Sequence, residues 1–177
     1  PDLLILLDQS EHNLFKIERE CEGSKHPVSF QPILGDIRDK TLLQRVFSSF
    51  NPDVVFHAAA YKHVPMQEDH PWEAILTNIQ GTLNLIDASE DYNVNRFVLV
   101  STDKAVNPTN IMGATKRVAE KLIQSKSIDS NVKFMAVRFG NVIGSSGSVI
   151  PTFQEQIRNG GPITITNPNM QRYFMSI

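Results

Sequence analysis

The chain has 177 residues, of which 41% are hydrophobic and 20% are charged, a balance that is typical of a globular domain and excludes a disordered or fibrous segment. The formal net charge is −2 and the Lys and Arg residues are scattered, which makes nucleic acid a poor candidate for the main partner. The lone Cys21 excludes an intramolecular disulfide and fits a reducing compartment, and no apolar run reaches the roughly 18 residues that cross a bilayer, so we expect this stretch to be soluble.

Short runs rich in Val, Ile, Leu and Phe alternate with longer segments in which apolar residues recur three and four positions apart. The predicted strands are residues 3–7, 28–33, 53–57, 95–100 and 132–138, and the predicted helices are residues 10–22, 39–50, 71–91 and 111–127. Strands and helices that alternate in this way predict an α/β fold, a doubly wound parallel sheet with helices on both faces.

The composition changes near residue 140, where Gly, Ser and Pro become frequent around a predicted helix at residues 151–159 and a predicted short strand at residues 163–166. We therefore expect residues 1–139 to form the main α/β domain and residues 140–177 to be part of a smaller substrate-binding region.

Ligands of doubly wound sheets bind beyond the carboxyl ends of the strands, so the side chains that follow each strand are the candidates for function. Asp8 ends the first strand, where an acid commonly accepts hydrogen bonds from an adenosine ribose and favours NAD over a 2′-phosphorylated cofactor. The alternative is that Asp8 caps the following helix, although Ser10 could fill that role equally well. Asp36 and Ile37 follow the second strand and could meet an adenine edge, but a turn in which Asp39 caps the next helix is equally compatible.

Small side chains follow the third strand at Ala58, Ala59 and Ala60. They would allow the backbone to approach a dinucleotide closely, although alanines also simply pack well against a helix. Lys62 and His63 come next and place a cation and an imidazole where a diphosphate or a sugar would lie. A solvated loop explains Lys62 alone, but it explains the set less well.

The fourth strand runs directly into two hydroxyls, a carboxylate and an amine, which are Ser101, Thr102, Asp103 and Lys104. An adjacent acid and base at the ligand end of a sheet suit paired proton transfers. The alternative is an exposed ion pair that neutralises itself. Met112 and Lys116 lie four residues apart in the next helix, a spacing that by itself indicates packing and a surface lysine.

Together these motifs resemble extended short-chain dehydrogenases, specifically the UDP-sugar 4,6-dehydratases of capsule and flagellin-glycan biosynthesis. The matching segments are residues 58–65, 101–104, 107–110, 112–117, 138–142, 147–151 and 172–175, and they extend over nearly the whole chain in the family's order. The resemblance implies a Rossmann-like fold, NAD as cofactor, a UDP-sugar as substrate and a homo-oligomer.

Two features depart from the usual pattern of this superfamily. Met112 occupies the position of the catalytic tyrosine of the Tyr-x-x-x-Lys unit, and a thioether cannot act as a base. Large membrane-anchored members of the branch are similar in carrying Met there, which implies a membrane region outside this chain and a place at the cytoplasmic face of the bacterial inner membrane. The first strand, glycine-rich loop and helix with which family members begin are also lacking, so we expect weak NAD binding by this segment alone, and micromolar affinity in calorimetry would refute that.

The resemblance further implies that NAD takes a hydride from C4 of a UDP-N-acetylhexosamine, such as UDP-N-acetylglucosamine, that water is eliminated across C5 and C6, and that the hydride returns to C6. Lys104 is the expected base for the C5 proton and Asp103 the expected acid for the C6 hydroxyl. Thr102 would bind the C4 oxygen and Lys116 the nicotinamide ribose. The C4 proton would leave through Asp103, Thr102 or a water.

The resemblance also implies the residues that bind each ligand, and no metal site is expected. The expected cofactor contacts are Asp8, Asp36, Ile37, Ala58, Ala59, Ala60, Lys62, Asn78, Val100, Ser101 and Lys116. The expected substrate contacts are Lys62, His63, Arg138, Asn141, Ser148, Val149, Pro151 and Arg172, of which Arg172 is equally compatible with a surface arginine.

Two other functions fit parts of the pattern. A nucleotide-sugar 4-epimerase would share the sheet and the NAD site, but it has no need of Asp103 and Lys104 and normally needs the missing tyrosine. A non-catalytic nucleotide-binding module would tolerate Met112, but it would gain nothing from paired proton-transfer groups.

Overall fold

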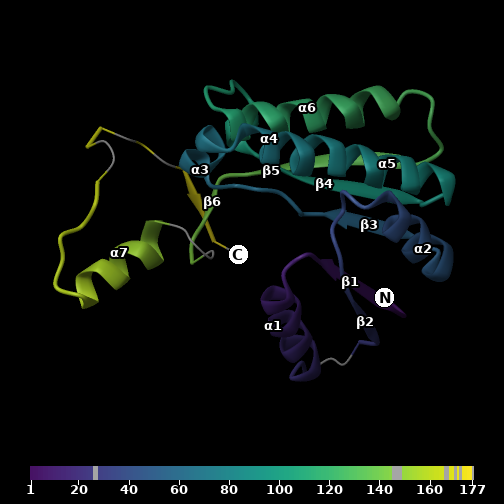
Figure 1. Cartoon of the computed structure of the whole chain (residues 1–177), viewed down its shortest axis with the longest axis horizontal. Coiled ribbons are helices and arrows are strands. Elements are labelled where there is room, and N and C mark those ends of the chain that lie inside the picture. Colours follow the sequence, from purple (N-terminus) through teal and green to yellow (C-terminus); the bar gives the residue numbers. More distant parts are fainter. Residues whose placement is uncertain (26–27, 145–148, 166–167, 170, 172, 177) are drawn as a thin grey trace.

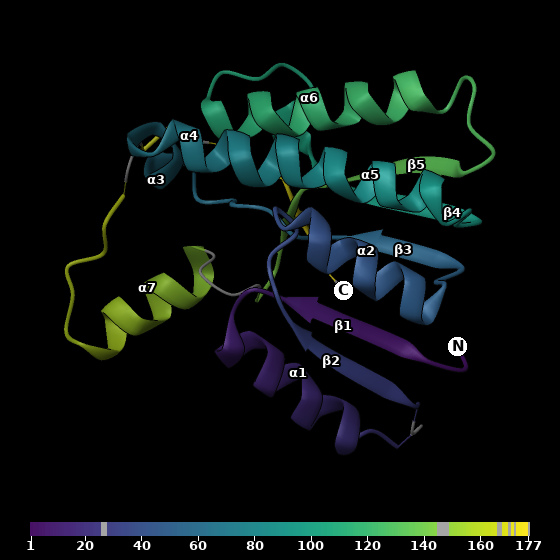
Figure 2. The same cartoon turned by 45° about the vertical axis from the view of Figure 1, so that its right-hand side comes forward.

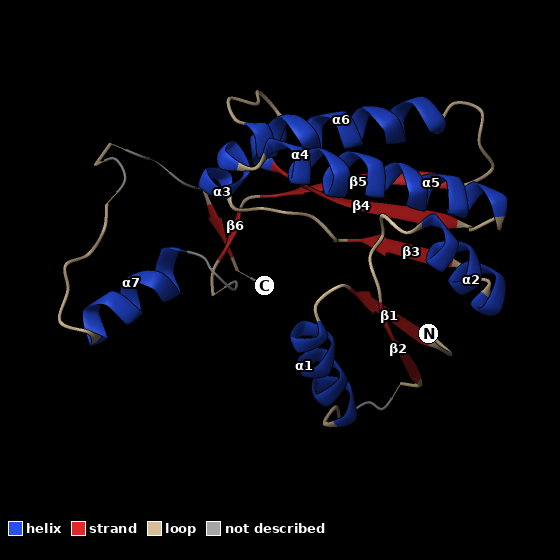
Figure 3. Cartoon of the chain, in the orientation of Figure 1, coloured by secondary structure: helices blue, strands red, loops and turns tan. Residues whose placement is uncertain are grey.

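Helices and strands alternate along most of the chain (Figures 1 and 3). The computed structural model describes residues 1–25, 28–144, 149–165, 168–169, 171 and 173–176. In chain order the elements are β1 (Leu4–Asp8), α1 (Glu11–Glu22), β2 (Phe30–Leu34), α2 (Lys40–Phe50), β3 (Val54–His57), α3 (Val64–Asp69), α4 (Pro71–Ala74), the π-helix η1 (Ile75–Gly81), α5 (Thr82–Asp91), β4 (Arg96–Thr102), the 3₁₀ turn η2 (Asp103–Ala105), α6 (Ile111–Lys126), β5 (Lys133–Phe139), β6 (Asn141–Val142), α7 (Val149–Arg158) and β7 (Phe174–Met175).

The strands pair in parallel, which confirms the predicted α/β class. They do not form one continuous sheet in the described part of the chain: β1 pairs with β2, β4 lies between β3 and β5, and β6 pairs with β7. The β1–β2 pair lies beside the β3–β4–β5 sheet with no hydrogen-bonded pairing between β1 and β3 (Figure 2). Residues of both β1 and β3 line the cavity that is described below.

The main core lies between the β3–β4–β5 sheet and the helices α2, α5 and α6. Leu43, Ile86, Phe97 and Leu99 are almost completely buried there, and each such side chain contributes roughly 1.5–3 kcal/mol. The helix α1 packs instead on β1 and β2, away from α5 and α6 (Figure 1). Phe56 of β3 is 74% exposed, so the opposite face of this sheet is less well covered.

Side chains that cap the helices place the helix starts next to the strand ends. The Ser10 hydroxyl accepts a hydrogen bond from the Asn13 N–H at α1, and the Asp39 carboxylate accepts one from the Leu42 N–H at α2. At α6 the side-chain oxygen Oδ1 of Asn110 accepts one from the Gly113 N–H at 2.8 Å. Each cap satisfies a donor that the helix itself leaves unpaired, and replacing one with Ala typically costs about 1 kcal/mol.

Several sequence-based expectations about local structure need correction. Residues 71–91 are helical as predicted but are wound as a π-helix over Ile75–Gly81, and the short helix α3 was not expected. The strand predicted at residues 163–166 is wrong for residues 163–165, and Thr166 lies outside the described residues. The Thr164 N–H donates instead to the Gln156 side chain at 3.1 Å, which takes this donor away from any strand ladder.

The region after residue 140 also begins differently. The predicted helix at residues 151–159 starts earlier, at Val149, so the predicted substrate contacts Val149 and Pro151 both belong to its first turn. The short strand that pairs with β6 is β7. The division into parts at residue 139 stays a prediction. In the part of the chain that the structure describes, no helix is both long enough and apolar enough to span a membrane.

Candidate functional site

The strands β1 and β3 line a cavity of about 580 Å³. This volume is within the range of roughly 300–1,000 Å³ that small-molecule sites occupy. Of the residues predicted to contact a cofactor, six line it together: Asp8, Asp36, Ile37, Ala58, Ala59 and Ala60. The structure therefore brings together three strand ends that are far apart in the sequence.

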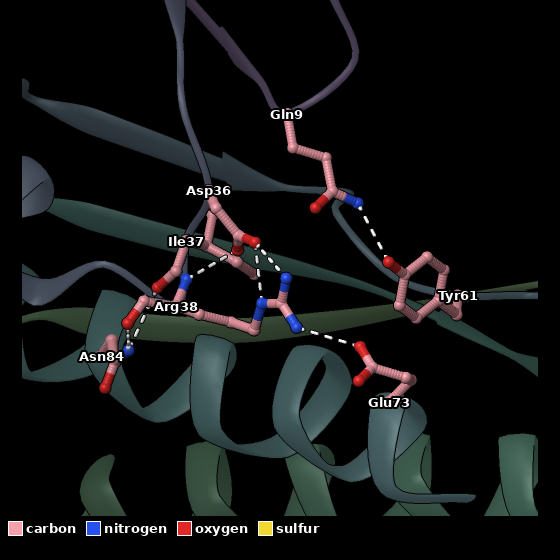
Figure 4. A network of polar contacts seen from close by, with 7 residues as sticks. All are labelled: Gln9, Asp36, Ile37, Arg38, Tyr61, Glu73 and Asn84. Carbon is pink, nitrogen blue, oxygen red and sulfur yellow. Dashed lines mark hydrogen bonds and ion pairs between the residues drawn. The ribbon is translucent and has the colours of Figure 1, made fainter. Parts of the chain in front are cut away.

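Asp8 lies at the end of β1, on the cavity wall. One of its carboxylate oxygens, Oδ1, accepts a hydrogen bond from the Ser10 N–H at 2.7 Å. The helix cap itself is Ser10, so the structure does not support the alternative in which Asp8 caps α1. Next to Asp8, the Gln9 amide reaches the Tyr61 hydroxyl at 3.4 Å, which links the two sides of the cavity (Figure 4).

Asp36 lies in the turn after β2 and is bound tightly by Arg38 (Figure 4). The Arg38 backbone N–H and side-chain Nε donate to the two carboxylate oxygens at 2.9 and 2.7 Å, and Arg38 also pairs with Glu73 at 3.0 Å. Burial acts to raise the pKa of Asp36, but the hydrogen bonds from Arg38 outweigh it and lower this pKa below its ordinary value. Asp36 is therefore an anion at the cavity wall.

His57 ends β3 and is almost completely buried. Its Nε2 lies 2.8 Å from the Thr82 hydroxyl, which in turn donates to the Asn78 carbonyl at 2.7 Å. Because Thr82 spends its hydrogen on Asn78, we assign the His57 proton to Nε2. Burial and the nearby Lys116 charge lower the pKa of His57 to about 3, so the ring is neutral near pH 7.

Asn78, predicted as a cofactor contact, has a structural task in the π-helix η1. Its side chain accepts from the Tyr61 N–H and donates to the Tyr61 carbonyl, at 2.9 and 3.1 Å, and it donates to the Thr115 hydroxyl at 3.0 Å. These bonds hold the segment after β3 against α6. π-helical turns are frequent at functional sites, and this one links the segment after β3 to α6.

Lys116 and Met112 lie on the buried face of α6, and each is only 5% exposed. The interpretation of Lys116 as a surface lysine is therefore wrong. Burial lowers the pKa of Lys116 from 10.5 to about 8, and the nearby Glu120 charge partly opposes this shift. A buried amine whose pKa is shifted in this way is a group whose charge can act on a ligand.

Thr102, Asp103 and Lys104 form a hydrogen-bonded group at the end of β4. The Asp103 Oδ1 accepts from the Lys104 Nζ at 3.0 Å and from the Thr102 hydroxyl at 2.9 Å. Burial acts to raise the pKa of Asp103, but these hydrogen bonds lower it below its ordinary value. Lys104 and Asp103 therefore form an ion pair, but the pair is half-buried and not exposed as in the alternative interpretation of the sequence, since the two side chains are 22% and 36% exposed.

The helix α6 packs very closely on this group. A Cβ atom at Gly113 would lie 2.6 Å from the Lys104 carbonyl oxygen, closer than real Cβ atoms approach such an oxygen. Only glycine allows the first turn of α6, which contains Met112, to approach the η2 turn to this extent.

Glu120 is the charged centre that the sequence did not reveal. Its buried carboxylate accepts hydrogen bonds from the Ser101 hydroxyl at 2.7 Å, from Arg138 at 2.8 and 2.7 Å, and from Arg117 at 3.0 Å. The hydrogen bonds from Arg138 lower the pKa of Glu120 to about 2, and those from Ser101 and Arg117 add to the effect against burial. Glu120 follows Lys116 by four positions, a helical spacing that could have indicated it.

Two residues that we predicted to contact ligands instead form hydrogen bonds with Glu120. The Ser101 hydroxyl, predicted to contact the cofactor, donates to Glu120 and is only 4% exposed as a residue. Arg138, predicted to contact substrate, is bound to the same carboxylate through two nitrogens. Val100, which precedes Ser101 in β4, is half-buried.

The remaining predicted substrate residues lie outside this buried group. Lys62 and His63 are exposed immediately before α3. Asn141 lies in β6, where its side chain donates to the Tyr173 carbonyl at 3.1 Å. Ser148 and Arg172 lie outside the described residues. No group of three or more His, Cys, Asp or Glu side chains in the described ranges is arranged to hold a metal ion.

Comparison with known proteins agrees with the resemblance seen in the sequence. The family model described as polysaccharide biosynthesis protein matches residues 1–177. The capsular polysaccharide biosynthesis protein CapD of Staphylococcus aureus is 50% identical over all of this chain and 30% of its own length. A UDP-N-acetylglucosamine 4,6-dehydratase (inverting) of Campylobacter jejuni is 43% identical over all of this chain and 52% of its own length.

Solved structures show the same fold. The structure of Pen from Bacillus thuringiensis matches 99% of this chain and 53% of that chain with a TM-score of 0.91 and 41% identity. More distant structures of the same fold include NAD-bound nucleotide-sugar dehydratases and epimerases, whose 18–23% identity supports the fold alone. The chain spans between 30% and 52% of the length of these curated relatives.

Proposed function

The chain belongs to the polysaccharide biosynthesis protein family, and on that premise we propose that it is the catalytic part of an NAD-dependent UDP-N-acetylhexosamine 4,6-dehydratase. The observation that carries the proposal is the hydrogen-bonded group of Thr102, Asp103 and Lys104 beside a buried Met112. A nucleotide-sugar 4-epimerase of this superfamily normally needs a tyrosine where Met112 lies, and it has no need of an adjacent acid and base.

The cavity between β1 and β3 fits the adenosine half of NAD. A carboxylate at the end of β1 suits a ribose hydroxyl pair, and the turn at Asp36 and Ile37 suits an adenine edge. The alanines after β3 allow the backbone to come close to the diphosphate. When bound, NAD supplies the acceptor for a hydride from C4 of the sugar and the donor of the same hydride to C6.

The hydrogen-bond directions in the Thr102 group support one route for the C4 proton. The Thr102 hydroxyl already donates to Asp103, so it can accept the C4 hydroxyl proton while it passes its own proton to the carboxylate. Asp103 then holds the proton that leaves with the C6 oxygen as water. This hydrogen bond supports our proposal that the C4 proton leaves through Thr102, one of the three routes that the sequence left open.

Lys104 is the proposed base for the C5 proton. Its ammonium is paired with the Asp103 carboxylate in the structure, at 3.0 Å. To take the C5 proton, Lys104 must first release one ammonium proton to solvent, and it is then the neutral amine that a base requires. The C5 proton taken by Lys104 returns to C5 when the hydride reaches C6, so the net products are the 4-keto-6-deoxy sugar nucleotide and one water.

Lys116 and the substrate side of the site complete the proposal. Lys116 would contact the nicotinamide ribose, and its positive charge would favour hydride removal from the sugar. Lys62, His63 and Asn141 are proposed to meet the UDP part of the substrate. The product would enter the biosynthesis of a surface polysaccharide or glycan, at the cytoplasmic face of the membrane.

The test is incubation of the intact protein with NAD and UDP-N-acetylglucosamine, with mass spectrometry of the sugar nucleotide. Loss of the mass of one water supports dehydration, and an unchanged mass with a changed sugar configuration supports epimerisation. Lys104→Ala should reduce turnover more than tenfold, a typical contribution of a general base being roughly 10²–10⁴-fold. The matched control is Lys121→Ala, which removes an exposed lysine of α6 and should leave turnover unchanged.

A further inference from the structure

The turn between β2 and α2 faces the cavity, and two backbone hydrogen bonds hold its ends, from the Gly35 N–H to the Asp8 carbonyl at 2.9 Å and from the Asp39 N–H to the Asp36 carbonyl at 3.0 Å. Gly35, Asp36 and Ile37 line the cavity, whereas the carbonyl groups of Ile37 and Arg38 point toward α5 (Figure 4). A turn at a ligand site has to be held in one conformation for its edge groups to select a ligand.

Asn84, on α5, binds both of these carbonyl groups. Its side-chain amide donates one hydrogen to the Ile37 carbonyl and one to the Arg38 carbonyl, each at 3.1 Å. Its own carbonyl oxygen accepts from the Gln80 amide at 2.9 Å. Asn84 is only 3% exposed, so all of its bonding capacity is directed at this turn and its own helix.

A second contact fixes the same turn from the same helical segment. The Ile37 side chain lies over Gly81, where a Cβ atom would come within 2.5 Å of Ile37 Cδ1. Gly81 precedes Asn84 by three positions, so both residues lie on the face of the helix that meets the turn. Asn84 therefore holds the backbone of the turn, and the Ile37 side chain packs on Gly81.

From these contacts we propose that Asn84 is a positioning residue for the adenosine half of the cofactor, acting through the turn at Asp36 and Ile37. The inference rests on the proposed function, since it assumes that NAD binds in this cavity. With both carbonyl groups held against α5, the Asp36 carboxylate and the Ile37 backbone are presented to the cavity in one orientation. Asn84 touches neither the cofactor nor the reacting atoms.

A positioning role of Asn84 affects binding of the adenosine half of NAD alone, whereas a purely structural role would affect binding of both halves. In the intact protein freed of bound nucleotide, Asn84→Leu removes both donors at similar side-chain volume. We expect the dissociation constant of ADP-ribose, measured by calorimetry, to rise roughly tenfold, the effect of losing one to two hydrogen bonds to the turn. The dissociation constant of nicotinamide mononucleotide should stay within about twofold. The NAD concentration that gives half-maximal turnover should rise, whereas kcat at saturating NAD should be unchanged.

Two further variants keep the test decisive. Asn84→Ser retains one small donor and should lie between wild type and Asn84→Leu, and it replaces the latter if Asn84→Leu does not fold. Glu73→Gln removes only the exposed contact of Arg38 and should bind ADP-ribose as wild type does. Equal weakening of both ligands, or unchanged ADP-ribose binding by Asn84→Leu and Asn84→Ser, would overturn the inference. Failure of wild type itself to bind ADP-ribose would overturn the proposed function as well.

Discussion

Replacing Glu120 by Gln tests whether the buried carboxylate holds three elements of the site together. The substitution keeps the shape of the side chain and removes its charge. The Ser101 hydroxyl of β4, Arg117 of α6 and Arg138 of β5 then lose their common anionic partner.

The pKa of Glu120 gives the size of the effect. Its fall from 4.5 to about 2 means that the folded state stabilises the carboxylate over the acid. By linkage this is worth roughly 3 kcal/mol of folding stability near pH 7. Because the pKa is lowered by folding, this stability is fully present above pH 4.5 and is lost as the pH falls through about 2. Gln resembles the protonated acid, so the difference between wild type and Glu120→Gln should shrink over the same range.

The assay is urea unfolding followed by circular dichroism at several pH values. The matched control is Glu90→Gln, which loses a pair with Lys126 whose side chains are 27% and 39% exposed, and which should cost less than about 1 kcal/mol. A loss of stability for Glu120→Gln no larger than that of the control, or a loss that is the same at pH 7 and pH 3, would refute the reasoning.

Three further predictions concern other buried groups of the site. The folding stability of wild type should rise from about pH 8 to 10.5, because the unfolded state holds the Lys116 ammonium proton more tightly than the folded state over that range, and Lys116→Met should abolish this rise. Urea midpoints of both proteins at several pH values measure the difference, and parallel curves would contradict the prediction. The His57 ring should remain neutral in nuclear magnetic resonance spectra between pH 5 and 8, and a titrating His57 signal in that range would show that the ring is not buried as described. Gly113→Ala should lower the free energy of unfolding by roughly 1–3 kcal/mol, because the new Cβ must displace the Lys104 carbonyl. The control Ala114→Gly should cost only about 1 kcal/mol. Equal costs in thermal unfolding would contradict the close approach of α6 to Lys104.

The α/β class, the order of the elements and the helix caps could be predicted because they depend on neighbouring residues. Apolar period and turn chemistry act over a few positions, so Asp39 and Ser10 could be recognised as caps from the sequence. The candidate strand ends followed from the general rule that parallel strands present their carboxyl ends at one edge. The strand predicted at residues 163–166 failed because the Gln156 side chain, on another element, takes a backbone donor of that segment.

The sequence by itself thus determined which residue types follow each strand, including the adjacent acid and base Asp103 and Lys104. Only the tertiary structure decided which charges act on one another. Ser101, Glu120 and Arg138 lie on three different elements, and their contact depends on how α6 packs against β4 and β5. The burial of Lys116 depends on packing in the same way, and so does the hydrogen bond from Asn84 to the Arg38 carbonyl, 46 positions away. Such contacts leave no periodic signal in the sequence, because packing between distant segments, and not local spacing, brings the atoms together.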